Sequence, residues 1–228
     1  MKIKSLFISD IHIGCGGNNI ENVVKILDDY EFDNLFLLGD IIDGWRLSVK
    51  WKWKKSYTKF FKKLIKLKDS GKKIIYVTGN HDEFLRNVTP INIGLCEICD
   101  EYIYDGRLLI HGDKFDTLIH NKKWLYFFGD KAYNILITVD QIFKLNGRLS
   151  KRVKKMVKQK INYLNDFYSV ATKYAKMKKC HTVICGHTHI QEEKVIDDVK
   201  YYNCGDMREC SCFLIEDING NITLESFD

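Results

Sequence analysis

Five short clusters of aspartate, histidine and asparagine interrupt this sequence, and each directly follows a run of apolar residues. They read "DIH" at 10–12, "GDIID" at 39–43, "GNHD" at 79–82, "HGD" at 111–113 and "GHTH" at 186–189. Imidazole nitrogen with carboxylate or amide oxygen suits divalent manganese, iron or zinc better than a structural cysteine site does. The clusters therefore predict a metal site that performs chemistry.

Seven candidate ligands in these clusters exceed what one tetrahedral metal takes, but they suit two metals that share a carboxylate. Two metals about 3.5–4 Å apart can clamp the attacking and departing oxygens of a phosphoryl displacement and generate hydroxide at neutral pH. Adjacent glycines would let backbone and phosphate approach closely. The pattern thus favours a phosphoester hydrolase.

Each cluster alone has a structural interpretation. Asp10 could cap the segment that follows, Gly39-Asp40 could form a turn, and His111 and His187 could be buried histidines with satisfied hydrogen bonds. Five clusters at five expected strand ends leave this interpretation little room. We therefore expect the clusters to meet in one site.

The elements that must position the clusters can be predicted from apolar periodicity. Buried strands are expected in "KIKSLFI" (2–8), "NLFLL" (34–38), "KIIYV" (73–77), "RLLI" (107–110) and "TVIC" (182–185), with amphipathic helices at 20–30 and 53–68. Alternating strands and helices indicate an α/β fold with a parallel sheet. Ligands bind at the carboxyl ends of strands in such sheets, where all five clusters fall.

The remainder is expected to form one domain, 1–228, with a helical insertion at about 115–178. Its first part is aromatic and apolar, its second has a helical apolar stripe that includes Ile161, Leu164, Tyr168 and Ala171, and no strand signal interrupts it. The insertion could be two helices packed on each other or a groove for acyl chains. Later strands end in hairpin turns at 197–199 and 219–221.

The net charge is +6, and the basic residues crowd into 50–68 and 148–160. Such runs favour polyanions, although a solvated helix face is their usual fate. Neither a secretory signal nor a transmembrane stretch is expected, so we predict a cytoplasmic protein with reduced cysteines. "CEIC" at 96–99 lacks a matching second pair for zinc, and Cys185 and Cys204 read as core residues.

The ordered clusters resemble the calcineurin-like metallophosphoesterase superfamily. That resemblance implies a four-layer αββα sandwich, two sheets flanked by helices, with two divalent metals at the strand ends; we expect manganese, with iron or zinc as alternatives. It assigns Asp10, His12 and His189 to one metal, Asn80, His111 and His187 to the other, and Asp40 to both. His81 would be catalytic at the departing oxygen, oriented by Asp43.

A closer resemblance, to the UDP-2,3-diacylglucosamine pyrophosphatase group of lipid A synthesis, is carried by "GDIIDGW", "YVTGNHDEFLR", "HGDKFD", "VICGHTHI" and "YYNCGD". It implies cleavage to UMP and 2,3-diacylglucosamine 1-phosphate, beneath an insertion that covers the acyl chains. One departure is His81, where the best-known members carry arginine.

The expected substrate carries a nucleotide- or lipid-linked phosphate. Trp45 and Arg86 lie in the matching segments and are predicted to contact it, and Arg148, Arg152 and Lys155 could meet its phosphates or the inner face of an anionic membrane. No obligate nucleic acid is expected. A nucleotide or nucleic-acid phosphodiesterase of the same superfamily is the main alternative, and a non-catalytic scaffold is a second.

Overall fold

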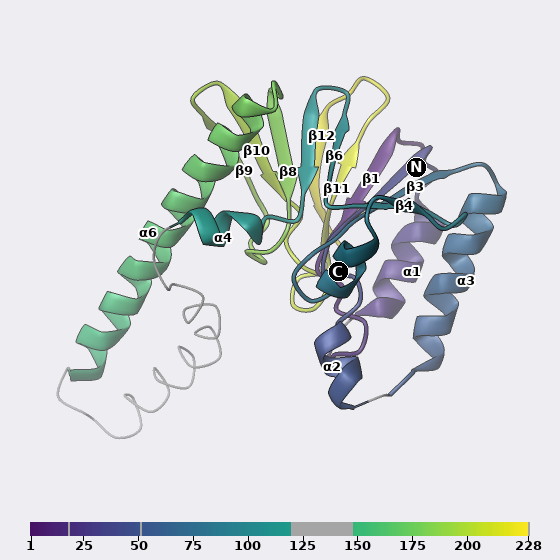
Figure 1. The fold of residues 1–228 in the computed structure, drawn as a ribbon, viewed down its shortest axis with the longest axis horizontal. Coiled ribbons are helices and arrows are strands. Elements are labelled where there is room, and N and C mark those ends of the chain that lie inside the picture. The colour runs from purple at the N-terminus through teal and green to yellow at the C-terminus, as the bar shows by residue number, and fades with distance from the viewer. Residues whose placement is uncertain (18, 51, 120–147, 228) are drawn as a thin grey trace.

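Two β-sheets pack face to face, with helices on both outer faces, in the computed structural model (Figure 1). It describes residues 1–17, 19–50, 52–119 and 148–227, with the backbone alone for 148–156 and 159. This mixed α/β sandwich confirms the predicted fold class.

The first sheet has the strand order β12-β11-β1-β2-β3-β5-β4. Strands β1, β2, β3 and β5 run parallel, while β4, β11 and β12 pair antiparallel with their neighbours. The bounds are β1 Ser5–Ile8, β2 Asn34–Leu38, β3 Lys73–Val77, β4 Ile91–Asn92, β5 Glu97–Cys99, β11 Cys212–Glu216 and β12 Ile222–Ser226.

The second sheet has the order β6-β7-β8-β10-β9, with β7, β8 and β10 parallel. Its bounds are β6 Glu101–Tyr104, β7 Arg107–Ile110, β8 Thr182–Cys185, β9 Glu192–Ile196 and β10 Val199–Asn203. The five strands that precede the polar clusters are thus divided between two sheets, three in the first and two in the second. Their carboxyl ends still meet, because the sheets face each other with these ends on the same side.

Helices α1 (Ile20–Asp29) and α3 (Lys55–Asp69) cover the outer face of the first sheet, while α4 (Lys114–Leu118) and α6 (Arg148–Met177) cover the second. The short α2 (Gly44–Val49) and a 3-10 turn, η1 (Glu83–Val88), follow two of the clusters. Burial on both faces explains the continuous apolar strands: Leu6 and Ile8 point toward the helices, whereas Phe7 packs between the sheets.

The carboxyl-terminal part of the predicted insertion belongs to the sandwich itself. Tyr163, Phe167, Ala171 and Ala175 of α6 are buried against the second sheet, whereas Ile161, a member of the expected stripe, is half exposed. The aromatic segment of the insertion falls mainly in 120–147, which lie outside the described residues. A helical insertion there stays a prediction.

Six of the eight cysteines have free thiols, as expected. Cys185 and Cys204 are core residues, and Cys96 and Cys99 pack into hydrophobic clusters on either side of the first sheet. The expectation of reduced thiols is wrong for Cys210 and Cys212, which form a disulfide. Their Cα atoms are 5.2 Å apart across Ser211, within the range that a disulfide spans.

Candidate metal centre

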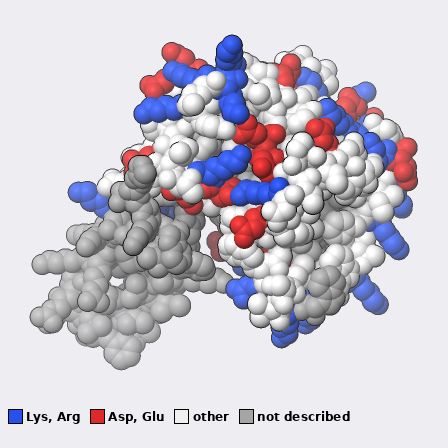
Figure 2. Space-filling view, in the orientation of Figure 1, with Lys and Arg blue, Asp and Glu red and all other residues white. Residues whose placement is uncertain are grey.

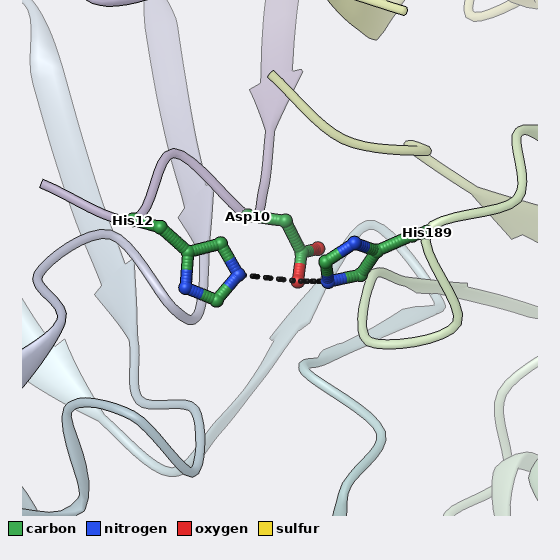
Figure 3. A group of neighbouring side chains, drawn as sticks. All are labelled: Asp10, His12 and His189. Atoms are coloured by element: carbon green, nitrogen blue, oxygen red, sulfur yellow. Dashed lines mark ion pairs between the residues drawn. The ribbon is translucent and has the colours of Figure 1, made fainter. Parts of the chain in front are cut away.

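Asp10, His12 and His189 come together from two strand ends that belong to different sheets (Figure 3). Asp10 Oδ1 is 3.1 Å from His189 Nε2 and 3.8 Å from His12 Nε2. Asp10 and His12 are buried, and their candidate ligand atoms lie with that of His189 within 4.8 Å of one another. This is the trio that the sequence analysis assigned to one metal.

Asp40 lies close to three of the histidines and to Asp10. Its Oδ2 is 3.5 Å from His111 Nε2, 3.8 Å from His12 Nε2 and 3.9 Å from His81 Nε2. Asp10, Asp40 and His111 form a second group of close ligand atoms. Asp40 therefore faces histidines from both sheets, and its role as a ligand shared by two metals stays a prediction.

The backbone at five of the candidate ligands has an unusual conformation, which sets the direction of their side chains. Asp10, His12, Asp40, His187 and His189 all have positive φ, between 51° and 68°. Such conformations strain residues other than glycine and occur preferentially at functional sites. Here the N–H groups of Asp10 and His12 donate to the carbonyls of Gly39 and Asp40, which ties the first two strand ends together.

Two glycines make the close packing of carboxylates feasible. A Cβ on Gly79 would collide with Asp40 Oδ1, and a Cβ on Gly186 would collide with Asp10 Oδ2. In place of side chains, the loops that begin there offer backbone donors: His81 N–H donates to Asp40 Oδ1 at 2.8 Å, and His187 N–H to Asp10 Oδ2 at 3.1 Å. These glycines therefore leave room for the carboxylates of Asp40 and Asp10.

His81 pairs with Asp43, as its predicted orientation requires. His81 Nδ1 is 3.2 Å from Asp43 Oδ2, while Asp43 Oδ1 accepts from the Arg46 N–H and so caps α2. Cys15 Sγ also donates to Asp43 Oδ2, at 2.9 Å. The carboxylate is thus fixed from several sides, and His81, Asp43 and His12 form a third group of close ligand atoms.

Asp82, the last residue of "GNHD", stabilises the turn through hydrogen bonds and does not occupy a candidate ligand position. Its Oδ2 accepts from Tyr76 Oη at 2.6 Å and from Ile41 N–H at 3.0 Å, and its Oδ1 accepts from the N–H of Gly79. Asp82 therefore locks the third strand end to the second, directly beside Asp40. The sequence signal for this role was the acid three residues after Gly79 in a tight turn.

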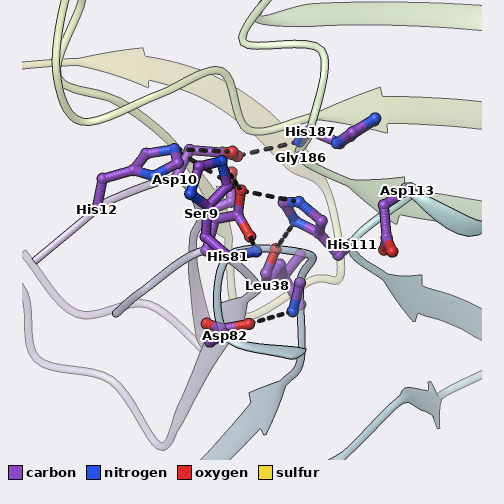
Figure 4. A network of polar contacts seen from close by, with 12 residues as sticks. Ser9, Asp10, His12, Leu38, His81, Asp82, His111, Asp113, Gly186 and His187 are labelled. Atoms are coloured by element: carbon purple, nitrogen blue, oxygen red, sulfur yellow. Dashed lines mark hydrogen bonds and ion pairs between the residues drawn. The ribbon is translucent and has the colours of Figure 1, made fainter. Parts of the chain in front are cut away.

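His187 points away from the other candidate ligands in Figure 4. Its Nε2 lies 2.9 Å from Asp116 Oδ2 in α4, and its ring packs near Phe167. Its ring centre is nevertheless only 5.2 Å from that of His111. Its assignment as a ligand stays a prediction, and the sequence analysis missed Asp116, which lies inside "HGDKFD".

The residues predicted to contact substrate differ in placement. Trp45 is half exposed and its ring lies 4.4 Å from that of His81, at the mouth of the cluster. Arg86 is held by Asp113 at 2.8 and 2.9 Å and by Thr78, so it links two strand-end loops, which does not favour a substrate contact. The side chains of Arg148, Arg152 and Lys155 lie outside the described part.

Burial and neighbouring charge oppose each other at the cluster. Burial alone raises the pKa of Asp40, but the adjacent His111 outweighs it and lowers that pKa to about 2. Burial likewise raises the pKa of Asp10, which His189 overcomes, so that pKa is also lowered. The pKa of His111 ends well above its usual value, because the Asp40 charge outweighs the cost of burial.

Three buried atoms test whether a metal fits. Asp10 Oδ1, Asn80 Oδ1 and His111 Nε2 have no hydrogen-bond partner among the described residues. His111 Nδ1 lies 2.8 Å from the Leu38 carbonyl, so a proton on Nδ1 leaves the Nε2 lone pair facing Asp40. Asp10 and His111 belong to one group of close ligand atoms. Divalent metals satisfy unpartnered lone pairs of nitrogen and oxygen that lie so close together. The residues therefore fit a metal centre.

The comparison with protein families agrees with this geometry. The model of the calcineurin-like phosphoesterase family matches residues 3–191, which contain all five clusters. The chain belongs to this family. Membership implies a phosphoester hydrolase of the metallophosphoesterase type, with the clusters above as candidate metal ligands. None of the curated proteins matches the chain.

Several solved structures are similar to this chain at low sequence identity. A double mutant of Vps29 from Entamoeba histolytica has a TM-score of 0.50 and 15% identity, covering 98% of this chain and 99% of that one. An archaeal phosphodiesterase has a TM-score of 0.47 and 16% identity, with coverage of 99% and 100%. A Streptococcus pneumoniae protein described as a predicted phosphoesterase has 0.41 and 13%, with coverage of 99% and 98%. At 15% identity, the likeness to Vps29 concerns the fold alone.

Within the described ranges, no helix combines the length and the apolar character needed to cross a bilayer.

Proposed function

We propose that this phosphoesterase uses two divalent metals to hydrolyse a phosphodiester or pyrophosphate bond. The observation that carries the proposal is the convergence of three buried residues, Asp10, Asp40 and His111, in one group of close ligand atoms. Asp10 Oδ1 and His111 Nε2 have no hydrogen-bond partner among the described residues. When bound, the metals would supply Lewis acidity and an activated water. Asp10, His12 and His189 would hold one, Asn80, His111 and His187 the other, and Asp40 both.

The remaining steps fall to residues beside the ligands. His81 would donate a proton from Nε2 to the departing oxygen, while its Nδ1 lies 3.2 Å from Asp43 Oδ2, which would orient the ring. Burial lowers the pKa of His81, but the Asp43 and Asp40 carboxylates outweigh it and the net shift is upward. A protonated His81 is the form that can act as a general acid.

For the substrate, we propose a UDP-linked acylated glucosamine, cleaved to UMP and an acylated sugar 1-phosphate. The support is the set of sequence segments similar to that pyrophosphatase group, together with the half-exposed ring of Trp45 beside His81. An aromatic face there offers a stacking surface for a base or sugar. Manganese is the proposed metal, and the inner face of an anionic membrane the proposed site of action.

A hydrolysis panel tests the substrate proposal. The metal-free chain would be reconstituted with manganese, iron or zinc and given UDP-2,3-diacylglucosamine, deacylated UDP-glucosamine, cyclic nucleotides and single-stranded DNA. Preference for the acylated substrate supports the proposal. Preference for cyclic nucleotides or DNA would move the nucleotide phosphodiesterase alternative ahead, and no hydrolysis with any metal would favour a non-catalytic scaffold.

The insertion can be tested separately. Because residues 163–175 are core, the replacement by a short loop should be limited to 120–147. If this segment covers acyl chains, hydrolysis of a small phosphodiester should persist while the Michaelis constant for the acylated substrate rises sharply, since each buried methylene is worth about 0.8 kcal/mol. Unchanged discrimination between acylated and deacylated substrates would remove the acyl-binding role.

A further inference from the structure

Arg208 lies on the loop that joins β10 to β11, at the edge of the metal centre. The N–H of the preceding residue, Met207, donates to the carbonyl of Asp10 at 3.3 Å. Asn19, just before α1, donates through Nδ2 to the carbonyl of Arg208 at 3.2 Å. The backbone of Arg208 is therefore tied to the strand end that carries Asp10 and to the start of α1.

Arg208 is half-buried, and its Nε lacks the hydrogen-bond partner that a buried donor normally has. That atom is buried, and no ion pair joins Arg208 to an acid of the described ranges. The nearest acid in sequence, Asp206, accepts instead from the backbone N–H groups of Arg208 and Glu209, at 2.6 Å each. By contrast, Arg86 and Arg107 are bound to Asp113 and Glu216.

An unpartnered buried donor on a charged group is costly, so its persistence needs a reason. The loop could supply an internal acid, but Glu209 is exposed and forms no ion pair with Arg208. A partner that comes and goes, such as a bound anion, removes the cost when it is present. The adjacent centre belongs to a family that acts on phosphoesters, which are anionic.

The charge of Arg208 acts on Cys15, which is in contact with Asp43. Cys15, whose thiol donates to Asp43, feels it electrostatically: burial is the main cause that raises the pKa of Cys15 to about 11, and Arg208 opposes that rise. Arg46, exposed in α2, opposes it as well. The two arginines differ in that Arg46 is solvated, whereas the Nε of Arg208 is already shielded from water.

We propose that Arg208 forms an anion subsite beside the metal centre, where its guanidinium binds a non-bridging oxygen of a substrate phosphate. The planar guanidinium matches the oxygens of a phosphate and is already partly desolvated, which favours charge-assisted hydrogen bonds. Histidines and carboxylates occupied by metal offer few donors to these oxygens. The subsite rests on the proposed function and adds a phosphate-recognising residue outside the five clusters.

The test compares Arg208→Gln with Arg208→Lys and, as a matched control for net charge, with Arg46→Gln. The substrates are bis(p-nitrophenyl) phosphate and whichever natural phosphoester the panel identifies. We expect the Michaelis constant to rise about 10- to 100-fold in Arg208→Gln, with turnover within about threefold and metal content unchanged, because a hydrogen bond to a charged group is lost. Arg208→Lys should fall between, and Arg46→Gln should differ from the parent by less than about twofold.

A binding measurement separates the subsite from the enzymatic proposal. Calorimetry with inorganic phosphate on the metal-loaded protein should show about tenfold weaker binding in Arg208→Gln than in the parent or in Arg46→Gln. If the parent hydrolyses nothing but binds phosphate through Arg208, the subsite stands and the proposed function fails. An active parent whose Michaelis constant and phosphate affinity survive Arg208→Gln would overturn the subsite.

A labelling experiment covers variants that fail to fold. Phenylglyoxal modifies accessible guanidinium groups, and its reaction at Arg208 of the parent can be followed by mass spectrometry with and without phosphate. We expect phosphate to slow modification at Arg208 several-fold more than at Arg46. Equal protection of the two arginines, or none, would count against the subsite.

Discussion

Glu216 and Asp10 are both fully buried acids, but they lie at opposite ends of the parallel strands and have different neighbours. Glu216 is opposite Ser5, at the start of β1. It accepts from Ser5 Oγ at 2.6 Å, Arg107 Nη1 at 2.8 Å and Lys4 Nζ at 3.2 Å. The two cations and the hydroxyl satisfy the hydrogen-bonding capacity of the Glu216 carboxylate. These contacts also join the two sheets.

Asp10, beyond the other end of β1, has histidines where Glu216 has Lys and Arg. Its Oδ1 faces His189 and His12 and makes no hydrogen bond, although its Oδ2 accepts from the backbone of His187. The arrangement at the Glu216 end is complete as it stands, while the Asp10 end presents lone pairs to a common space. A buried acidic residue therefore indicates a functional site when one of its oxygen atoms is left without a hydrogen bond. Burial alone does not indicate one.

Basic side chains also gather on the surface away from the metal centre. The face in Figure 2 shows them along the edge where α3 lies in Figure 1, whereas acidic and basic side chains are mixed near the middle. Lys55, Lys59, Lys62 and Lys66 of α3 are exposed and lie at helical spacing on one side. These lysines form a solvent-exposed helix face, as runs of charged residues usually do. They are not part of the metal centre.

The largest effect should follow from Asp40→Ala. Because Asp40 lies between His111, His12 and His81, its loss should cost metal content and reduce activity by more than the roughly 100-fold that loss of a supporting group costs. Metal analysis after manganese reconstitution and steady-state kinetics measure both. The same change in Glu216 should leave both nearly unchanged. An active Asp40→Ala protein with two metals would refute the shared-ligand role.

His81→Ala should lower turnover by about 10²–10⁴-fold with metal content preserved, since a general acid is lost while the candidate ligands remain. Nitrophenyl diesters, whose leaving groups need no proton, should suffer less than alkyl esters. An equal loss for good and poor leaving groups would instead assign His81 to phosphate binding. His81→Arg sharpens the test: retained activity on the acylated pyrophosphate would favour that second role.

The Glu216 end should respond in stability and not in catalysis. Glu216→Ala leaves Arg107 and Lys4 without their shared partner, and breaking a buried ion pair from one side costs about 3–5 kcal/mol. Denaturant unfolding of the metal-free protein measures this. Asp105→Ala, which removes the exposed partner of the same Lys4, is the control and should have little effect. A Glu216→Ala protein of parental stability would contradict the contrast between the two ends.

The difference between the ends also explains what the sequence could predict. Each of β1, β2, β3, β7 and β8 is a short apolar run followed within three residues by Asp, Asn or His, so both the strands and the candidate ligands were predicted from local pattern. Strand β5 (Glu97–Cys99) was not, because it has three residues of mixed polarity and forms by pairing with β3. The pairing of the sheets came from family resemblance, not from periodicity.

The directions of several side chains could not be predicted from the sequence. The apolar stripe of α6 could be read through Ile161 or through Tyr163 and Phe167, and contact with the second sheet selects the latter. His187 lies in a correctly predicted cluster, but whether its Nε2 faces a metal or Asp116 depends on α4, a helix of five residues with no strong signal. Arg208 and Cys15 carry no motif and were visible only through their contacts.

The smallest effect is expected at Cys15, and it tests how tightly the metal-centre end is organised. Cys15 is buried and its thiol donates to Asp43 Oδ2, the same oxygen that faces His81 Nδ1 at 3.2 Å. Cys15→Ala removes one weak donor, so turnover should fall about 2- to 10-fold, equivalent to roughly 0.5–1.5 kcal/mol. Cys15→Ser keeps a donor and should recover most of the loss. The deficit should be greater for poor leaving groups, because Asp43 acts through His81. If Cys15→Ala instead lowers metal content or affects all leaving groups equally, the thiol supports packing around His12, and the orientation of Asp43 does not depend on it.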